Sequence, residues 1–348
     1  MNQRIPPRVS RRAFLTTALA SSGAAVVALG QRASAQEPVV HHSGAEAMHD
    51  APPGSTGGHG GHDASGLVGE VDLTAFDPTQ FLTHFDWGRE STTSEGRTLR
   101  EWEITAIDKE VEVAPGVWFP AWTYNGQVPG PTFRCRQGDL LRFHFRNASS
   151  MPHTIHFHGI HPPSMDGVTP MIPTGGEFTY EFEARPFGLH LYHCHVMPLK
   201  RHIHKGLYGT FIIDPPEGRP PAREMVMVMN AFDTNFDNEN EIYAVNTVAF
   251  HYANHPIQVK VGEPIRIYLV NITEFDPINS FHLHAGMYRL YRTGTDLERY
   301  EYTDNVIMGQ GERHVLEFTL EYPGPYMFHA HQSELAELGW MGFFEATE

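Results

Sequence analysis

Four His-x-His pairs recur along the chain, two in each of two segments that resemble one another. The pairs are His156/His158, His193/His195, His282/His284 and His329/His331. Their surroundings match too, because residues 138–147 align with 262–271 and residues 188–195 align with 324–331. Side chains at i and i+2 of a β-strand share one face, so each pair presents two imidazoles side by side. The repetition predicts two copies of one fold, each with two imidazole pairs.

Short runs rich in Val, Ile, Phe, Tyr and Thr alternate with Gly and Pro turns from about residue 95 onward, which is typical of all-β domains. The expected strands are residues 97–107, 140–147, 178–183 and 210–214 in the first half, and residues 225–229, 257–261, 264–270 and 314–318 in the second. A proline-rich linker at residues 215–221 separates the halves. Two β-sandwiches of roughly 130 residues each fit this pattern.

Cys194, one of two cysteines in the chain, stands between His193 and His195. The preceding residues 188–192 are an expected strand, so the thiol should lie on the face opposite the two imidazoles. Ligands for two different metal centres would then lie on three consecutive residues. The eight imidazoles of the four pairs exceed the roughly four ligands of one tetrahedral zinc, and they suit a cluster of several ions.

Partners for the Cys194 thiol are expected on its own face. His153 lies an odd number of residues before His156 and falls on that face, and His202 follows downstream. Cysteine with two histidines is the ligand set of a trigonal blue-copper site with a weak axial position. Leu207 is the candidate axial neighbour, a side chain without a donor atom.

These motifs resemble the multicopper oxidase family. The resemblance rests on His153-x-x-His156-x-His158-Gly159, on the triplet at residues 193–195 and on residues 125–132, and it spans most of residues 95–348. It is strongest with small two-domain, laccase-like members that carry the blue copper in the first domain. It implies two tandem cupredoxin-like Greek-key β-sandwiches, at residues 69–217 and 218–348. It also implies copper as cofactor, roughly four ions per chain, and reduction of O2 to water.

The resemblance also implies a role for each ligand. A type 1 copper would use His153, Cys194 and His202, with Leu207 as axial non-ligand. The type 2 copper would use His156 and His282. The coupled type 3 pair would use the remaining imidazoles, which are His158, His193, His195, His284, His329 and His331.

Two departures from the family pattern bear on these roles. Larger members place the second type 1 histidine five residues after the cysteine, where this chain has Leu199, so His204 competes with His202. The spacing from His202 to Leu207 resembles copper nitrite reductases and favours His202. The second copy has Ala330 in the place of the cysteine, which predicts no type 1 copper there.

Two acids are candidate proton relays. Asp166, in the loop after His158, resembles the family acid beside the type 2 copper, although Asp before Gly is also an ordinary turn former. Glu334, three residues after His331, is the second candidate, and a solvated loop acid is an equally good interpretation.

Three further functions compete with laccase-like oxidation of phenols and aromatic amines. Oxidation of Cu(I) for copper tolerance is suggested by methionines near the type 1 ligands, although thioethers also pack apolar surroundings. These methionines are Met151, Met165, Met171 and Met197. A copper nitrite reductase shares the two cupredoxin domains, but its pattern has an acid where this chain has His156. A copper carrier would use the blue copper without turnover.

The first 68 residues indicate export. Residues 1–35 resemble a twin-arginine signal, with Arg11-Arg12, an apolar run and the cleavage site Ala33-Ser34-Ala35, which predicts a periplasmic or otherwise extracytoplasmic protein. Residues 36–68 are Gly- and His-rich and are expected to be a disordered linker, or else a copper-capturing tail. Cys135 is expected to be a lone buried thiol.

The formal charge of −16 at pH 7 opposes binding to nucleic acid or to anionic membranes. The expected partners are a small-molecule reductant and O2. Each half offers four cluster imidazoles, so a complete cluster needs two domains that face each other. If these cannot meet within one chain, the first domain of one chain must meet the second domain of the next, which closes a ring. The resemblance implies a homotrimer.

Overall fold

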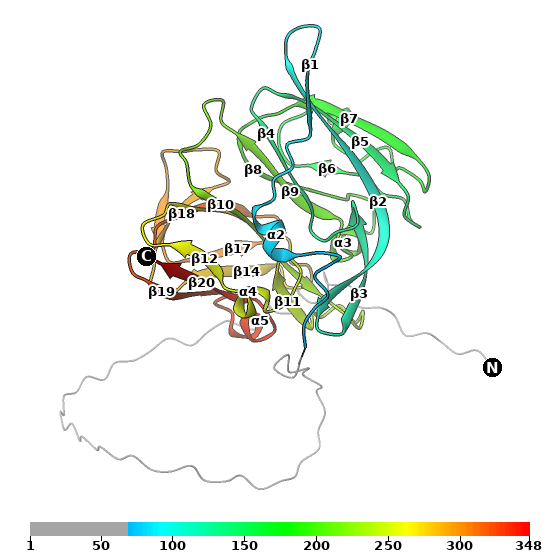
Figure 1. Cartoon of the computed structure of the whole chain (residues 1–348). Helices are drawn as coiled ribbons and strands as arrows, with labels where there is room; N and C mark the ends of the chain where they lie inside the picture. Colours follow the sequence, from blue (N-terminus) through cyan, green and yellow to red (C-terminus); the bar gives the residue numbers. More distant parts are fainter. Residues whose placement is uncertain (1–68) are drawn as a thin grey trace, which may run out of the picture. The chain divides into compact units, whose positions relative to one another are not determined.

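The computed structural model describes residues 69–348, so the expected signal and the His-rich segment lie outside the described residues. Within that range, no helix has the length and apolar character needed to cross a bilayer. The strands form two groups, cyan to green and yellow-green to red in Figure 1, which correspond to the two halves of the sequence.

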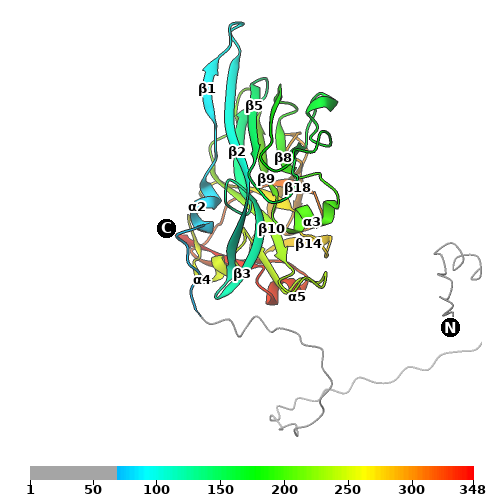
Figure 2. The same cartoon turned by 90° about the vertical axis from the view of Figure 1, so that its right-hand side faces the viewer.

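The first half builds two sheets. One has the order β1-β2-β5-β7, with β3 paired to β2, and the other has the order β4-β9-β8-β6. Their bounds are β1 Arg89–Thr92, β2 Thr98–Ala114, β3 Val117–Tyr124, β4 Gly130–Arg136, β5 Leu140–Asn147, β6 His156–Phe157, β7 Glu177–Glu183, β8 Gly188–His193 and β9 Tyr208–Asp214. Strand β1 and the start of β2 reach beyond the other strands (Figure 2). Three short helices accompany the sheets, α2 Pro78–Thr83, η2 Pro163–Met165 and α3 Leu199–His204.

The second half repeats this plan. One sheet has the order β11-β10-β13-β18-β15-β16 and the other the order β12-β20-β19-β14-β17. The strands are β10 Arg223–Phe232, β11 Ile242–Val245, β12 Ile257–Lys260, β13 Ile265–Asn271, β14 Ile278–Leu283, β15 Tyr288–Arg292, β16 Glu301–Thr303, β17 Asn305–Gly309, β18 Arg313–Phe318, β19 Gly324–His329 and β20 Met341–Thr347, and the helices are α4 His251–Asn254 and α5 Ser333–Glu337.

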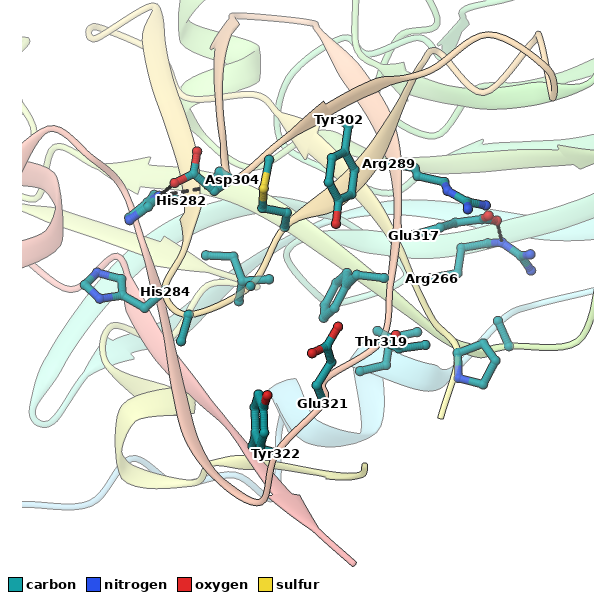
Figure 3. Close-up of a pocket in the computed structure, with 18 of the residues that line it drawn as sticks. Arg266, His282, His284, Arg289, Tyr302, Asp304, Glu317, Thr319, Glu321 and Tyr322 are labelled. Atoms are coloured by element: carbon teal, nitrogen blue, oxygen red, sulfur yellow. Dashed lines mark hydrogen bonds and ion pairs between the residues drawn. The ribbon is translucent and has the colours of Figure 1, made fainter. Parts of the chain in front are cut away.

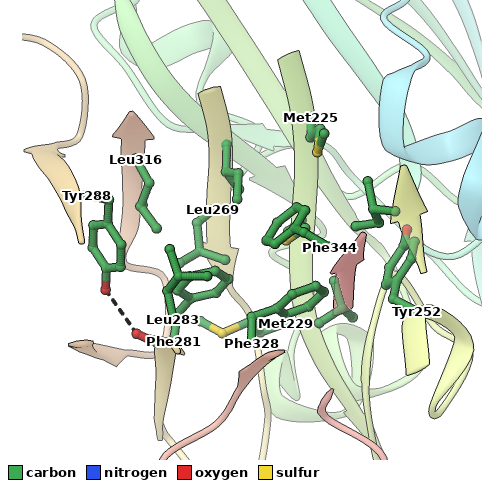
Figure 4. Packing of buried hydrophobic residues seen from close by; sticks show 14 of the residues in the cluster. Met225, Met229, Tyr252, Leu269, Phe281, Leu283, Tyr288, Leu316, Phe328 and Phe344 are labelled. Carbon is green, nitrogen blue, oxygen red and sulfur yellow. Dashed lines mark hydrogen bonds between the residues drawn. The ribbon is translucent and has the colours of Figure 1, made fainter. Parts of the chain in front are cut away.

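Strand β5 shows why these sequences form strands with one buried face. Its residues alternate, so that Leu141, Phe143 and Phe145 are buried while Arg142 faces outward. This period of two matches the pleat of a strand. Phe143 stacks on Trp102 of the neighbouring strand, with ring centroids 4.6 Å apart. In the second half, β14 and β19 contribute Phe281 and Phe328 to an equivalent aromatic core (Figure 4).

A third hydrophobic cluster joins the halves. It combines Phe119 and Leu191 from the first half with Val226, Tyr268 and Val315 from the second. The buried Arg134 of β4 adds a polar clamp, because its guanidinium contacts carboxylates from both halves. The residues before β1 also bridge the halves, since the Tyr252 hydroxyl donates a hydrogen bond to the carbonyl of Pro78 in α2.

The predicted fold class is confirmed: the chain is all-β, with sheets that repeat between its two halves. The predicted segment 140–147 coincides with β5, and the matching segment in the second half forms β13. Strand β2 is longer than expected, because its far end pairs with β3, which the sequence pattern missed. The expected boundary between residues 217 and 218 falls between β9 and β10.

His314 of β18 gives a test of how burial of neutral histidine affects stability. Both ring nitrogens are buried and have no hydrogen-bond partner within residues 69–348, and burial lowers the pKa of His314 to about 4. An unfolded histidine, with a pKa of about 6.5, takes up a proton first as the pH falls. Stability is therefore lost progressively as the pH falls from about 6.5 towards 4.

Replacing His314 by leucine should remove one buried histidine that takes up a proton on unfolding. We expect the variant to be at least as stable as the parent at pH 7, because no hydrogen bond is lost. Between pH 7 and 5 it should lose about 2 kcal/mol less stability than the parent. Thermal unfolding at both pH values measures this, with His84→Leu on the surface as the control. An identical response of the parent and both variants to pH would contradict the prediction.

Candidate copper centre

The thiol of Cys194 lies between two imidazoles. Its Sγ is 3.3 Å from Nδ1 of His202 and 3.8 Å from Nδ1 of His153, and the two Nδ1 atoms are 3.1 Å apart. The backbone N–H of Thr154 also points at the sulfur, at 3.5 Å. His202 reaches this position because α3 follows the end of β8 closely. The structure thus brings together the three predicted donors.

The protonation states suit metal binding. Burial lowers the pKa of His153 to about 3 and that of His202 to about 4, so both rings are neutral and keep a free lone pair. Burial also raises the pKa of the Cys194 thiol, so a thiolate there needs a cation beside it. A thiolate with two neutral imidazoles fits copper. The fully buried Leu207 lies in the same apolar cluster as Cys194 and offers no donor atom.

The competing histidine is placed elsewhere. His204 packs its ring against Phe119 and Phe275, with centroids 5.2 and 4.8 Å away. Its Nε2 accepts a hydrogen bond from the backbone N–H of Asp233. His202 rather than His204 therefore faces Cys194.

Neither His153 nor His202 offers an exposed ring edge through which a substrate could pass electrons directly. The two residues are 0% and 1% exposed. The ring of Trp122 covers both, with centroids 5.1 and 4.9 Å from theirs. The indole is itself buried, so solvent reaches neither imidazole.

The first group of four imidazoles lies on β6 and at the end of β8. The His156 ring is 5.1 to 5.3 Å from the other three, and Nε2 of His158 is 3.2 Å from Nε2 of His193. Burial lowers the pKa of His158 to about 2 and that of His193 to about 4. These four residues, His156, His158, His193 and His195, are called the first imidazole group below.

The second half repeats this arrangement on β14 and β19. His282 is 4.8 to 5.4 Å from the other three rings, and Nε2 of His284 is 2.9 Å from Nε2 of His329. Burial lowers the pKa of both His284 and His329. The second imidazole group consists of His282, His284, His329 and His331. Ala330 stands between the last two, in the place of Cys194.

Two aspartates occupy matching places beside these groups. The carbonyl of Asp166 is 2.7 Å from Nδ1 of His156, and its Oδ1 is 3.2 Å from the same nitrogen. In the second half the carbonyl of Asp304 is 2.9 Å from Nδ1 of His282. Sequence reasoning found Asp166 and missed Asp304, because the latter lies on the β16–β17 connection, far in sequence from its histidine.

Glu334 does not join either group. It is exposed on α5. Among residues 69–348 it makes no hydrogen bond or ion pair with a histidine of the second group. The interpretation as a solvated acid describes its surroundings.

The two imidazole groups remain apart within one chain. Across the described residues, no hydrogen bond or ring contact joins a member of the first group to a member of the second. The second group is the more open, since His284 and His331 are exposed. A groove of about 810 Å³ begins at His282 and His284 and continues past Tyr302 to Tyr322 (Figure 3).

Three of the four methionines considered for Cu(I) oxidation are at the surface. Met197, Met171 and Met151 are 74%, 58% and 39% exposed. Packing of the apolar surroundings of the site therefore does not explain these three. Met165 is half-buried and accepts a hydrogen bond from the backbone N–H of Glu181.

Cys135 lies on β4, fully buried and without a disulfide, as expected for a lone thiol. The fold and the sites define a duplicated β-sandwich protein with one Cys–His₂ donor set and two four-imidazole groups.

Family models described as multicopper oxidase match residues 106–218 and residues 218–348. The chain belongs to the multicopper oxidase family. Membership implies copper binding. A solved multicopper oxidase structure shares 56% sequence identity and superposes with a TM-score of 0.77, covering 78% of this chain and 98% of its own.

The relatives differ in their activities. A copper-containing nitrite reductase of Neisseria meningitidis serogroup A is 28% identical over 250 residues, which cover 66% of this chain and 64% of the relative. This chain thus spans just under two thirds of that relative's length. A copper resistance protein A homolog of Pseudomonas syringae pv. tomato is 33% identical over 144 residues, covering 40% of this chain and 24% of its own. The copper nitrite reductase structure from Nitrosomonas europaea is 28% identical with a TM-score of 0.66, covering 72% of this chain and 94% of its own.

Proposed function

We propose that this chain is a laccase-like oxidase that couples one-electron oxidation of phenols or aromatic amines to reduction of O2 to water. The observation that carries the proposal is the pair of matching four-imidazole groups, the first of which adjoins the Cys–His₂ set. Copper bound at these residues would supply the one-electron chemistry and the reduction of O2. A nitrite reductase, as the resemblance describes it, has an acid where this chain has His156.

The residues of the chain have distinct tasks in this proposal. His153, Cys194 and His202 hold a type 1 copper, with Leu207 as apolar neighbour. His193 and His195 flank Cys194 in the sequence, so three consecutive residues connect the thiol to the first imidazole group. Asp166, with Oδ1 3.2 Å from Nδ1 of His156, is placed to relay protons to that group.

Steady-state O2 consumption by the copper-loaded protein tests this function. With 2,6-dimethoxyphenol as reductant we expect O2 uptake, and roughly four bound copper ions per chain. Consumption of nitrite with about two copper ions would indicate the reductase instead. Copper binding without turnover of any reductant would indicate a carrier.

We also propose that the complete cluster forms between chains, with the first imidazole group of one chain facing the second group of the next in a ring of three. Three exposed apolar side chains near the open second group, Met287, Tyr302 and Tyr322, line the groove of Figure 3 and support this. Such side chains are suited to burial at a contact between copies. A head-to-tail contact of this kind closes into a ring.

Complementation between two inactive variants tests this assembly. His158→Ala disables the first group and His284→Ala disables the second, and each variant alone should be inactive. Co-expressed, they should regain about one quarter of the parental activity, because one contact in four then pairs two intact groups. Sedimentation of the parent gives the number of chains. No recovery from a mixed oligomer would mean that each cluster forms within one chain.

Oxidation of Cu(I) is the second candidate function, favoured by the exposed thioethers of Met151, Met171 and Met197. Changing all three to leucine should raise KM for Cu(I) and leave phenol oxidation unchanged if Cu(I) is a substrate. Equal effects on both reductants would argue against it. We further propose export across a membrane, on the basis of the twin-arginine pattern at residues 1–35.

A further inference from the structure

A hollow of about 530 Å³ lies beside α3, on the segment that carries His202. Its walls come from α3 and its flanks and from two parts of the second half, residues 233–238 and Phe275. Its lining is rich in cations although the chain is acidic. It adjoins Trp122, the side chain that covers His153 and His202.

Three cations line the hollow: Lys200, Arg201 and Lys205. None of them makes an ion pair within residues 69–348, although the whole chain has a formal charge of −16. One carboxylate, that of the buried Asp233, also lines it. Its two oxygens already accept hydrogen bonds from the backbone N–H groups of Asp237 and Asn238. Among the residues that line the hollow, three cations therefore face one carboxylate, which leaves a net positive charge on its walls.

Aromatic rings share the walls with the cations. Nζ of Lys200 lies 4.2 Å from the ring centroid of Phe275, and Nζ of Lys205 lies 5.1 Å from that of Phe236. The ring of Phe236 is 53% exposed. The phenyl rings can pack against the ring of a bound aromatic compound. The neighbouring cations can at the same time attract an anionic group on that compound.

Two of these cations, Arg201 and Lys205, also lie beside Trp122, which covers the Cys194 site. The guanidinium carbon of Arg201 is 5.2 Å from the ring centroid of Trp122, and Nζ of Lys205 is 5.9 Å from a centroid of the same side chain. Trp122 in turn contacts the rings of His153 and His202. A ligand in the hollow is thus separated from the two imidazoles by these cations and one indole.

We propose that this hollow binds the organic reductant and selects aromatic compounds that carry an anionic group, such as a carboxylate or a sulfonate. This rests on the proposed oxidase function and names its substrate class. A phenol bound there loses one electron and its hydroxyl proton to become a phenoxyl radical. Four such oxidations supply the four electrons, and four protons complete the reduction of one O2 to two waters.

Binding of a redox-inert probe tests the proposal separately from activity. Isothermal titration of the copper-loaded, full-length protein with naphthalene-2-sulfonate should show binding that weakens with added salt. The neutral naphthalene-2-sulfonamide should bind about tenfold more weakly. Lys200→Glu should reduce sulfonate affinity by about tenfold, whereas Lys260→Glu, the same charge change on the exposed end of β12, should not.

Kinetics give the matching readout. Lys200→Glu should raise KM for syringate about tenfold and change KM for 2,6-dimethoxyphenol, which lacks the carboxylate, much less. Equal binding of sulfonate and sulfonamide, or equal effects of the two lysine variants, would overturn the proposal. So would binding of an acidic protein in the absence of sulfonate binding. Sulfonate binding at this site without O2 uptake from any phenol would instead refute the oxidase function and leave the anion site standing.

Discussion

Replacing Cys194 by serine is expected to abolish both the intense blue absorption of the copper-loaded protein and its oxidation of phenols. The thiolate is the soft donor that lies beside His153 and His202, and a hydroxyl does not replace it as a copper ligand. The eight imidazoles of the two groups should still bind copper. Visible absorption, copper content and O2 uptake with 2,6-dimethoxyphenol measure these three effects.

The matched control is Cys135→Ser. This thiol is equally buried, on β4, within an apolar cluster, and its Sγ donates a weak hydrogen bond to the carbonyl of Ile212. The variant should keep its colour and activity at a modest cost in stability. Full phenol oxidation by the Cys194→Ser variant would show that electrons do not enter through this site.

Arg134→Met is expected to destabilise the fold by about 3–5 kcal/mol. The guanidinium donates to Asp214 of the first half at 2.8 Å and to Glu224 of the second half at 2.6 Å. Although burial opposes the charge, hydrogen bonds to Glu224 and Asp214 raise the pKa of Arg134 above its usual range. The substitution removes the cationic partner of two largely buried carboxylates, those of Asp214 and Glu224. Glu224 keeps its ion pair with Arg266, whereas Asp214 loses the guanidinium it was paired with.

Urea unfolding at pH 7, followed by fluorescence, measures the loss. Arg97→Met is the control, because its ion pair with Glu183 is largely exposed, at 39% and 48% of the two side chains. An exposed pair of this kind contributes about 0–1 kcal/mol. Equal losses in the two variants would show that the clamp between the halves is not a principal source of stability.

The sequence by itself determined the class of the fold and identified the side chains of the candidate metal sites. Alternation with a period of two predicted β5, and the repeat predicted that β13 would match it, because strand geometry is local. The same local geometry predicted that the two imidazoles of each His-x-His pair lie on one face of a strand. The division of residues 193–195 between two sites followed from the opposite faces of a strand, and the structure places the thiol and the imidazoles accordingly.

Only the tertiary structure decided which distant residues meet. The choice of His202 over His204 depends on how α3 turns back towards Cys194, and the place of Asp304 depends on a connection between two strands. Trp122 and the unpaired cations of the hollow gave no sequence signal, since an indole or a lysine on its own is unremarkable. Which side chain covers a site, and which cations gather around one hollow, depends on how remote segments pack together. No local sequence pattern encodes that packing.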